Sequence, residues 1–566
     1  MRTTGKTVGV EPIRQFRAAP VGLLADFSGG SGVRKDSARP LSDSAKVLRR
    51  LAFAFVALAL AGCSRSGAHW GTPGEVRYAF RGDIWTLNPL LAFSQRLIDL
   101  TQIYCQPLVA VGPDDRAQPL LITEIPTVAN GGVSRDGLTI TYHLRRDVRF
   151  ADGVPFTSKD VAFTYRAIVD PRNPVTEVAP YKRIASLETP DPYPVRVRLK
   201  APWSGAVREL FAESDYIYGI LPAHAFGGNT DITHAKWNEK PFGTGPFYVT
   251  QWKRGDRVVL ERNPYSWQSP KLRRIVMKIM PDQNAALVAL RAHAVDLTDI
   301  TYPQIAQVKA EPGIALVGVP RNETDELELQ TQRPAMRDLR VRRAIAAAVD
   351  RAAIARSAFF GYAPLATTEI PPLFPEHDAS IPQLRYDPQA ARALVAAHGP
   401  MAPLVIVFSA ADATERTIAT LVQADLAHAG IAARLRGYEP SLLYGPAAEG
   451  GIYYGGRFDI AVTGWFGGLD PEASEAWTCV NRAPNGPNLA RWCDARYDAA
   501  YAAQQLEMNP VRRAVQFAIM QQRMRAELPS IFLVNRTEFE ALNPALHGFA
   551  PNMIYNFSQT QAWDLR

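Results

Sequence analysis

The sequence lacks the short motifs that mark the common classes of enzyme. Within its 566 residues no HExxH, GxSxG or GxxxxGK[ST] segment occurs, no GxGxxG follows a strand, and the histidines stand singly. The glycines of GTGPF, at 243–247, have the wrong spacing for a phosphate loop and predict a tight turn before a strand at 247–252. These absences disfavour an enzyme without excluding one, and they give no support for a resident metal or cofactor.

A hydrophobic run long enough to span a bilayer is also missing. The longest candidate, LAFAFVALALAG at 51–62, falls short of the roughly 20 apolar residues that a membrane helix needs. The basic stretch KVLRR at 46–50 precedes it and Cys63 follows, which is the order of a secretory signal peptide. LAGC at 60–63 resembles the lipobox of bacterial lipoproteins, so Cys63 is expected to be acylated; the alternative is a chance Cys after a signal or a buried helix.

The residues before this leader do not fit a signal peptide, which normally begins close to the start of the chain. Residues 1–45 are rich in Ser, Gly and Arg and have no apolar periodicity. We expect translation to begin near Val47, read as Met, which would give a leader of normal length ending at Gly62. N-terminal sequencing of the precursor tests this, because any peptide from 1–45 contradicts it. Residues 63–74 would then form a lipid-anchored tether.

The positive charge of the chain belongs mostly to the leader. The whole sequence carries +8, but residues 1–62 hold ten Lys/Arg and four Asp/Glu, which leaves 53 basic and 51 acidic residues in the remainder. The mature part is therefore close to neutral, and its charge gives no support for nucleic-acid binding.

Cysteine is scarce, with four in the chain. Cys479 and Cys493 lie 14 apart in a loop-like segment, a spacing that suits a disulfide in an exported protein. No CxxC or nearby His completes a metal-ligand set there. Cys105 sits in the apolar run IYCQPLVAV and is expected to be a buried free thiol.

Strand and helix patterns alternate along the chain, which indicates an α/β protein of several lobes. Strands are predicted at 138–145, 195–200, 257–262, 403–410 and 458–465. Helices are predicted after a capping box at 157–160, from Asp338 to the glycine at 361 with its arginines outside, from the Asp-Pro at 387–388 to Gly399, and at 415–430.

Six segments, in one order, resemble the peptide-binding family of bacterial extracellular solute-binding proteins, family 5, which contains dipeptide, oligopeptide and nickel binders. They are TLNPLL (86–91), SRDGLTITYHLRRDVRFADGVPFTSKDVAFTY (134–165), KPFGTGPFYVTQWKRGDRVVLERNPYSW (240–267), DLRVRRAIAAAVDR (338–351), RYDPQAARALVAAHG (385–399) and VTGWFGGLDP (462–471). The resemblance covers nearly all of residues 75–560.

The resemblance implies a periplasmic-binding-protein-like α/β fold of the cluster C type, with two lobes joined by a hinge and an extra inserted subdomain. Lobe I would comprise 75–112, 235–322 and 535–566, the inserted subdomain 113–234, and lobe II 323–534. The ligand would be enclosed between the lobes by hinge closure.

In peptide-binding relatives the Asp of the late GW…DP motif contacts the amino group of the ligand, and its match here is Asp470, although the spacing is one residue shorter than the dipeptide pattern. Because Pro471 follows, a turn residue or helix N-cap is the alternative. Trp465 and Phe466, which follow Gly464, are candidate pocket walls or plain core residues.

Further candidates lie elsewhere in the chain. Ser94 and Gln95 belong to LLAFSQR (90–96), a segment that can touch ligand in relatives. Gln330 stands where relatives often carry Asn, a departure that bears on the hinge or the pocket. The Arg or Lys for a ligand carboxylate is open, with Arg333 only a guess.

The resemblance implies a monomeric substrate-binding lipoprotein that delivers a di- or oligopeptide to the permease and ATPase of an ABC importer, at the periplasmic or cell-surface face of the membrane. A nickel chelate, an opine or an oligosaccharide remains an alternative solute, since one fold serves many ligands. A secreted hydrolase or a lipoprotein chaperone is the alternative from another class.

Overall fold

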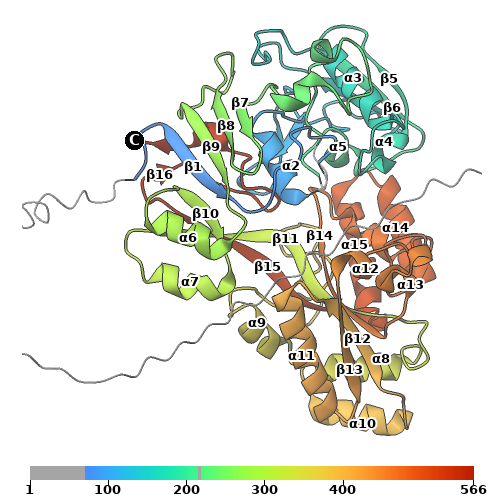
Figure 1. Cartoon of the computed structure of the whole chain (residues 1–566). Coiled ribbons are helices and arrows are strands. Elements are labelled where there is room, and N and C mark those ends of the chain that lie inside the picture. Colours follow the sequence, from blue (N-terminus) through green and yellow to red (C-terminus); the bar gives the residue numbers. More distant parts are fainter. Residues whose placement is uncertain (1–69, 93, 215–217) are drawn as a thin grey trace, which may run out of the picture. The chain divides into compact units, whose positions relative to one another are not determined.

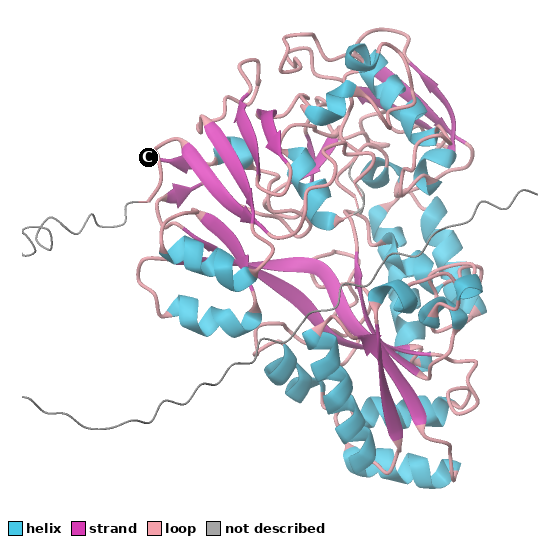
Figure 2. Ribbon diagram, viewed as in Figure 1, coloured by secondary structure: helices cyan, strands magenta, loops and turns pink. Residues whose placement is uncertain are grey.

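A ten-stranded mixed sheet runs through the molecule (Figures 1 and 2). The computed structural model describes residues 70–566 apart from 93 and 215–217. The strand order is β13 (Ala433–Tyr438), β12 (Leu404–Ser409), β14 (Ile460–Phe466), β11 (Ala315–Leu329), β15 (Ser530–Leu542), β10 (Leu297–Ile300), β1 (Glu75–Phe80), β9 (Arg274–Ile279), β8 (Arg257–Arg262) and β7 (Phe247–Lys253). The predicted α/β class is confirmed.

The two long strands β11 and β15 connect the two halves of this sheet (Figure 1). They pair antiparallel over most of their length; β15 continues to β10 on one side, and β11 to β14 on the other. Their register shifts between Pro320 and Thr324 and again between Asp325 and Glu326. Such irregularities allow a strand to bend between two packed units. The predicted lobe boundaries at 322/323 and 534/535 fall in this stretch and remain predictions.

Helices cover both halves. Beside β10 lie α6 (Gln283–Arg291) and α7 (Tyr302–Lys309), whereas the β12–β14 half carries α8 (Leu339–Ala348), α9 (Arg351–Ala358), α10 (Pro388–His398), α11 (Ala413–His428), α14 (Ala495–Leu506) and α15 (Pro510–Glu527). The capping by Asp387 and the end at Gly399 are as predicted for α10. The shorter elements are α2 (Gln95–Gln102), β2 (Val109–Val111), β3 (Ala117–Pro119), α12 (Pro440–Leu443), η3 (Ala447–Glu449), α13 (Ile452–Gly455), η4 (Glu472–Trp477), β16 (Leu546–His547), η5 (Thr560–Ala562) and β17 (Asp564–Leu565).

The single helix predicted from Asp338 to the glycine at 361 is wrong, because the structure divides it into α8 and α9. Val349 is extended, with a ψ of 115°, and Asp350 then caps α9 by accepting a hydrogen bond from the Ala353 amide at 2.8 Å. The amide of Asp350 donates to the Asp425 carboxylate at 2.9 Å, which fixes the break against α11.

The prediction that the arginines of this segment lie outside is also wrong for two of them. Arg342 is 5% exposed and donates to the carbonyl oxygens of Met336 and Glu527 at 2.6 and 2.8 Å. Arg351 is 4% exposed and donates to the carbonyl of Ala366 at 2.7 Å and to other backbone acceptors. Hydrogen bonds to several carbonyls compensate the burial of a guanidinium, so an apolar helix face can include it.

A smaller three-stranded sheet forms between β3 and β7 in the sequence. Its order is β4 (Thr139–His143), β6 (Pro194–Leu199) and β5 (Ile184–Glu188), and it is accompanied by α3 (Ser158–Val169), α4 (Ala179–Lys182), α5 (Ala206–Glu209), η1 (Ala223–Phe226) and η2 (Lys236–Glu239). The predicted capping box is present at the start of α3, where Thr157 and Asp160 exchange hydrogen bonds. We call residues 113–234 the inserted segment below.

The glycines of GTGPF allow two backbone segments to pack closely, and neither adopts a left-handed backbone conformation. A Cβ at Gly243 would lie 2.1 Å from the carbonyl oxygen of Tyr104, and one at Gly245 would lie 2.5 Å from that of Ile103. Backbone therefore packs directly against backbone here, beside Cys105, which is buried and free as predicted.

Candidate functional site

A pocket of about 420 Å³ lies where the inserted segment meets the chain that follows β14. The inserted segment supplies Glu177, Ala179, Pro180, Tyr181, Arg183, Trp203, Glu209, Ser214 and Tyr218, and the later chain supplies Trp465, Phe466, Asp470, Glu475, Ala476, Asn481 and Pro487. The volume is at the lower end of the roughly 300–1,000 Å³ typical of small-molecule sites.

Strand β14 places two of the predicted residues at this pocket. Trp465 and Phe466 are its last residues, and Phe466 keeps 47% of its surface exposed. Pairing with β11 fixes the strand end, since Phe466 lies opposite Glu323. Gly464 does not line the pocket; a Cβ there would lie 3.2 Å from the carbonyl of Thr324 in β11.

Asp470 also lines the pocket, but its carboxylate is held by protein cations. Arg513 of α15 donates to its two oxygens at 2.6 and 2.7 Å, and Arg208 approaches at 3.4 Å. The Asp470 side chain has no exposed surface and that of Arg513 is 5% exposed. Burial alone would raise the pKa of Asp470, but the charges and hydrogen bonds of Arg513 and Arg208 together outweigh burial and hold that pKa below its usual range. A ligand ammonium would have to compete with Arg513 for this carboxylate.

Polar contacts join the inserted segment to α14 and to the loops that carry Glu376 and Asp470, next to the pocket. Arg208 of α5 reaches Glu376 at 3.2 Å as well as Asp470. The hydroxyl of Ser204 donates to the carbonyl of Gln504 at 2.7 Å, and Arg183 donates to the Gln505 side chain at 2.8 Å. These contacts set the distance between the two walls.

The wall from the inserted segment is aromatic and anchored. The Tyr181 hydroxyl accepts a hydrogen bond from the Phe211 amide at 3.1 Å, and the Tyr218 hydroxyl accepts one from the Glu177 amide at 2.8 Å. The guanidinium of Arg183 lies 4.3 Å from the centre of the Trp203 ring. These three rings are 1–4% exposed, so they form a rigid apolar backing for the pocket.

Carboxyl groups interrupt this apolar surface. Glu177 uses one oxygen to accept a hydrogen bond from the Ala179 amide at 2.7 Å. Burial raises the pKa of Glu177, and the negative charge of Glu475 raises it further. Glu475 stands on the opposite wall and is exposed, so its charge acts on Glu177 across the pocket.

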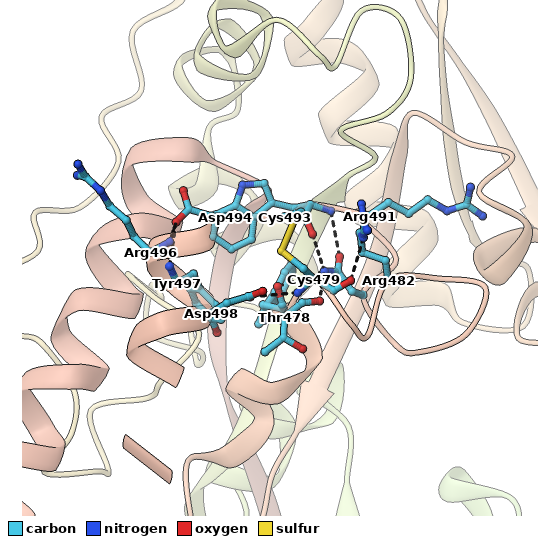
Figure 3. The surroundings of a disulfide bond; sticks show 12 residues. Thr478, Cys479, Arg482, Arg491, Cys493, Asp494, Arg496, Tyr497 and Asp498 are labelled. Atoms are coloured by element: carbon cyan, nitrogen blue, oxygen red, sulfur yellow. Dashed lines mark hydrogen bonds between the residues drawn. A yellow bond between two sulfur atoms is a disulfide. The ribbon is translucent and has the colours of Figure 1, made fainter. Parts of the chain in front are cut away.

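A disulfide closes the loop that carries Asn481 and Pro487 (Figure 3). It joins Cys479 to Cys493, whose Cα atoms are 4.6 Å apart. The amide of Cys479 also donates to Asp498 of α14 at 3.1 Å. The loop is thus tied at its base to the helix that follows it.

The other predicted site residues lie away from this pocket. Ser94 is the N-cap of α2 and accepts a hydrogen bond from the Leu97 amide at 3.4 Å, and Gln95 begins that helix. Gln330 is 3% exposed at the opposite end of β11, where its side chain donates to the Gly456 carbonyl at 3.3 Å. Arg333 pairs there with Asp459 at 3.1 Å. None of these four residues lines the pocket.

The wall from the inserted segment was missed by sequence reasoning. Glu177, Tyr181, Trp203 and Tyr218 belong to no motif, and they lie more than 240 residues before Trp465 in the chain. No local pattern distinguishes them from ordinary core aromatics and surface acids. Among residues 70–566, gaps aside, no group of three or more His, Cys, Asp or Glu is arranged to hold a metal ion.

The predicted leader and Cys63 lie outside the described residues. In the part that the structure describes, none of the helices combines the length and the apolar character that crossing a bilayer requires.

Comparison with known proteins gives consistent results. A family model described as bacterial extracellular solute-binding proteins, family 5 (middle region), matches residues 117–486. Di/tripeptide-binding protein 2 of Pseudomonas aeruginosa is 26% identical over 472 residues, covering 78% of this chain and 86% of its own, and the nickel-binding periplasmic protein of Escherichia coli is 26% identical over 424 residues, covering 71% and 78%. The crystal structure of the ABC transporter substrate binding protein CtaP from Listeria monocytogenes superimposes with a TM-score of 0.78 at 21% identity, covering 88% of this chain and all of the other.

Proposed function

The chain belongs to the bacterial extracellular solute-binding proteins of family 5, with the two-lobed fold of that family, and we propose that it captures a short peptide for an ABC importer. The pocket between the inserted segment and the end of β14 is the proposed peptide site, with Trp465 and Phe466 as walls. Asp470 is proposed to act there through the ion pair with Arg513, which fixes the pocket floor.

One observation carries this proposal. A pocket of about 420 Å³ is walled by five aromatic side chains and carries several charged groups, and the family signature that ends β14 supplies two of those rings. Apolar walls with a few fixed polar groups are what recognition of a small organic solute requires. A di/tripeptide-binding protein and a nickel-binding protein are similarly distant relatives, so the lining of the pocket carries the choice of a peptide.

The proposal includes export and membrane attachment. The run at 51–62 followed by Cys63 supports cleavage and acylation, which would place the protein at the periplasmic or cell-surface face of the membrane. A monomer would then hand its solute to the permease and ATPase subunits of the importer. Mass spectrometry of the protein from membranes tests the anchor, because a mature N-terminus other than acylated Cys63 contradicts it.

A thermal-shift titration tests the solute class. The full chain, purified and freed of carried-over ligand by unfolding and refolding, is titrated with dipeptides, tripeptides, opines, sugars and Ni²⁺-histidine. A ligand that binds only the folded state adds about 2.7 kcal/mol to the unfolding free energy at a concentration 100 times its Kd. The melting temperature therefore rises. A shift with peptides supports the proposal; a shift with one of the other classes and none with peptides overturns it.

A further inference from the structure

Each wall of the pocket carries a carboxylate. Of the described lining residues, Glu177 stands on the wall from the inserted segment and Glu475 on the facing wall, whereas Arg183 is the one guanidinium. Glu209 also lines the pocket but interacts with other groups, and Arg513 balances the charge of Asp470 with two hydrogen bonds. Glu177 and Glu475 are therefore the lining carboxylates to which a ligand cation can bind.

The single lining cation is already engaged. Arg183 donates to Gln505 at 2.8 Å and lies 4.3 Å from the centre of the Trp203 ring. Glu177 is held in place by the Ala179 amide; burial and then the charge of Glu475 raise its pKa, although the Ala179 bond and the charge of Lys182 act in the opposite direction. A cation placed between these two carboxylates would offset the charge of Glu475 and favour the ionised state of Glu177.

The aromatic walls suit the same kind of group. Of the five rings that border the pocket, Trp465 is half-buried and Phe466 is exposed, whereas Tyr181, Trp203 and Tyr218 are at most 4% exposed, so the end of β14 supplies the ring faces that a ligand can reach. Aromatic faces attract ammonium and guanidinium groups, and the attraction grows where water is excluded. An apolar stem that carries the positive charge would pack against the same rings.

A second, independent observation points to a ligand. The indole Nε1 of Trp203 is buried and has no hydrogen-bond partner among the described residues, although the side chain is only 4% exposed and borders the pocket. A buried donor without an acceptor is unfavourable, because it has given up its hydrogen bond to water. A ligand that brings a carbonyl or carboxylate oxygen to this wall would satisfy it.

From these observations we infer that the pocket selects a short peptide with a positively charged side chain, whose cation lies between Glu177 and Glu475 and whose carbonyl or carboxylate oxygen accepts from Trp203. The inference rests on the proposed peptide-binding function and deepens it. Glu177 and Glu475 are the specificity-determining residues. The pocket volume limits the ligand to a few residues.

Calorimetric titration of the full chain with three matched dipeptides tests the inference. Alanyl-lysine and alanyl-norleucine differ only in the terminal ammonium, and alanyl-glutamate reverses the charge. We expect alanyl-lysine to bind at least tenfold more tightly than alanyl-norleucine, which is about 1.4 kcal/mol, and alanyl-glutamate to bind more weakly than either. The preference should shrink between 50 and 500 mM salt.

Two variants and a control locate the effect. Glu177→Gln keeps an acceptor for the Ala179 amide, and Glu475→Gln changes an exposed side chain, so both should fold. Each variant should raise the Kd for alanyl-lysine three- to thirtyfold and leave the Kd for alanyl-norleucine unchanged. Glu239→Gln, an exposed acid outside the pocket, should alter neither.

The outcomes separate this inference from the proposed function. If the three dipeptides bind equally, or if the Glu→Gln variants keep the full preference, the inference is overturned and the peptide proposal stands. If no dipeptide binds but agmatine does, the charge selection holds and the peptide proposal is overturned. If none of these compounds binds, both are overturned.

Discussion

Replacing Arg513 by Met should destabilise the protein strongly, because it leaves the Asp470 carboxylate buried without its main partner. The side chain of Asp470 has no exposed surface, and among the described residues only Arg208, 3.4 Å away and 32% exposed, would remain to balance it. Removing one member of a buried ion pair costs about 3–5 kcal/mol. Gln504 would lose its bond from the Arg513 Nε, which adds about 1 kcal/mol. We therefore expect a loss of about 4–6 kcal/mol near neutral pH.

The pH dependence of this loss identifies its cause. In the native protein the pKa of Asp470 is held below its usual range, so the pair contributes stability above about pH 4 and loses it as the pH falls through the depressed value. In Arg513→Met, burial would dominate and raise the pKa of Asp470 above that of the unfolded chain. The variant should then gain stability as the pH is lowered from 8 to 5, because protonation removes the buried charge.

Urea unfolding followed by far-UV circular dichroism at pH 5 and pH 8 measures both effects. Arg512→Met is the matched control: this adjacent arginine is exposed, its described partner is the surface residue Glu507, and its replacement should leave the midpoint unchanged. The double variant Asp470→Leu/Arg513→Met should be more stable than Arg513→Met alone. A loss below about 1 kcal/mol for Arg513→Met, or a loss that does not depend on pH, would show that Arg513 does not stabilise the protein by balancing the buried Asp470 carboxylate.

Three further outcomes follow from the structure. Replacing Cys479 and Cys493 together by Ser opens a loop whose ends are 14 residues apart in the sequence, and should reduce the unfolding free energy by about 3 kcal/mol. Urea titration against the oxidised protein measures this loss, and an unchanged free energy would contradict a stabilising role of the disulfide. Gly243→Ala should lower the unfolding free energy by about 1–3 kcal/mol in the same assay, because its Cβ would lie 2.1 Å from the Tyr104 carbonyl oxygen. An unchanged urea midpoint would show that the surrounding backbone moves to accommodate the methyl group. Burial raises the pKa of Glu213 from about 4.5 to about 8. The protonated side chain therefore stabilises the fold fully below pH 4.5, and this stabilisation is lost as the pH rises toward 8. In Glu213→Gln the melting temperature should fall less over that pH range than in the parent protein.

Local sequence patterns were sufficient for most of the secondary structure. Thr157 and Asp160 identified the start of α3, and Asp387 that of α10, because side-chain caps act within a few residues. The break between α8 and α9 was missed, because in the sequence Asp350 looks like a polar residue on the surface of one helix. In the structure its amide donates a hydrogen bond to Asp425 of α11. That contact is tertiary, and no window of sequence contains it.

The candidate site could be predicted only in part, for the same reason. Trp465, Phe466 and Asp470 stand in one motif, and the structure brings all three to one pocket. The ion pair of Asp470 with Arg513 joins residues 43 apart, and the facing wall lies in the inserted segment. Residue types at such separations carry no periodic signal, so burial and charge balance in the pocket become visible only in the fold.

A solute-binding protein takes up its ligand and returns it unchanged. Equilibrium dialysis of the full chain against a peptide that it binds, followed by mass spectrometry of both compartments, measures this directly. We expect saturation at one peptide per chain and recovery of all of the peptide at its original mass. Cleaved or modified peptide would indicate a hydrolase, and binding without a defined stoichiometry would indicate a chaperone; either result would be incompatible with a solute-binding function.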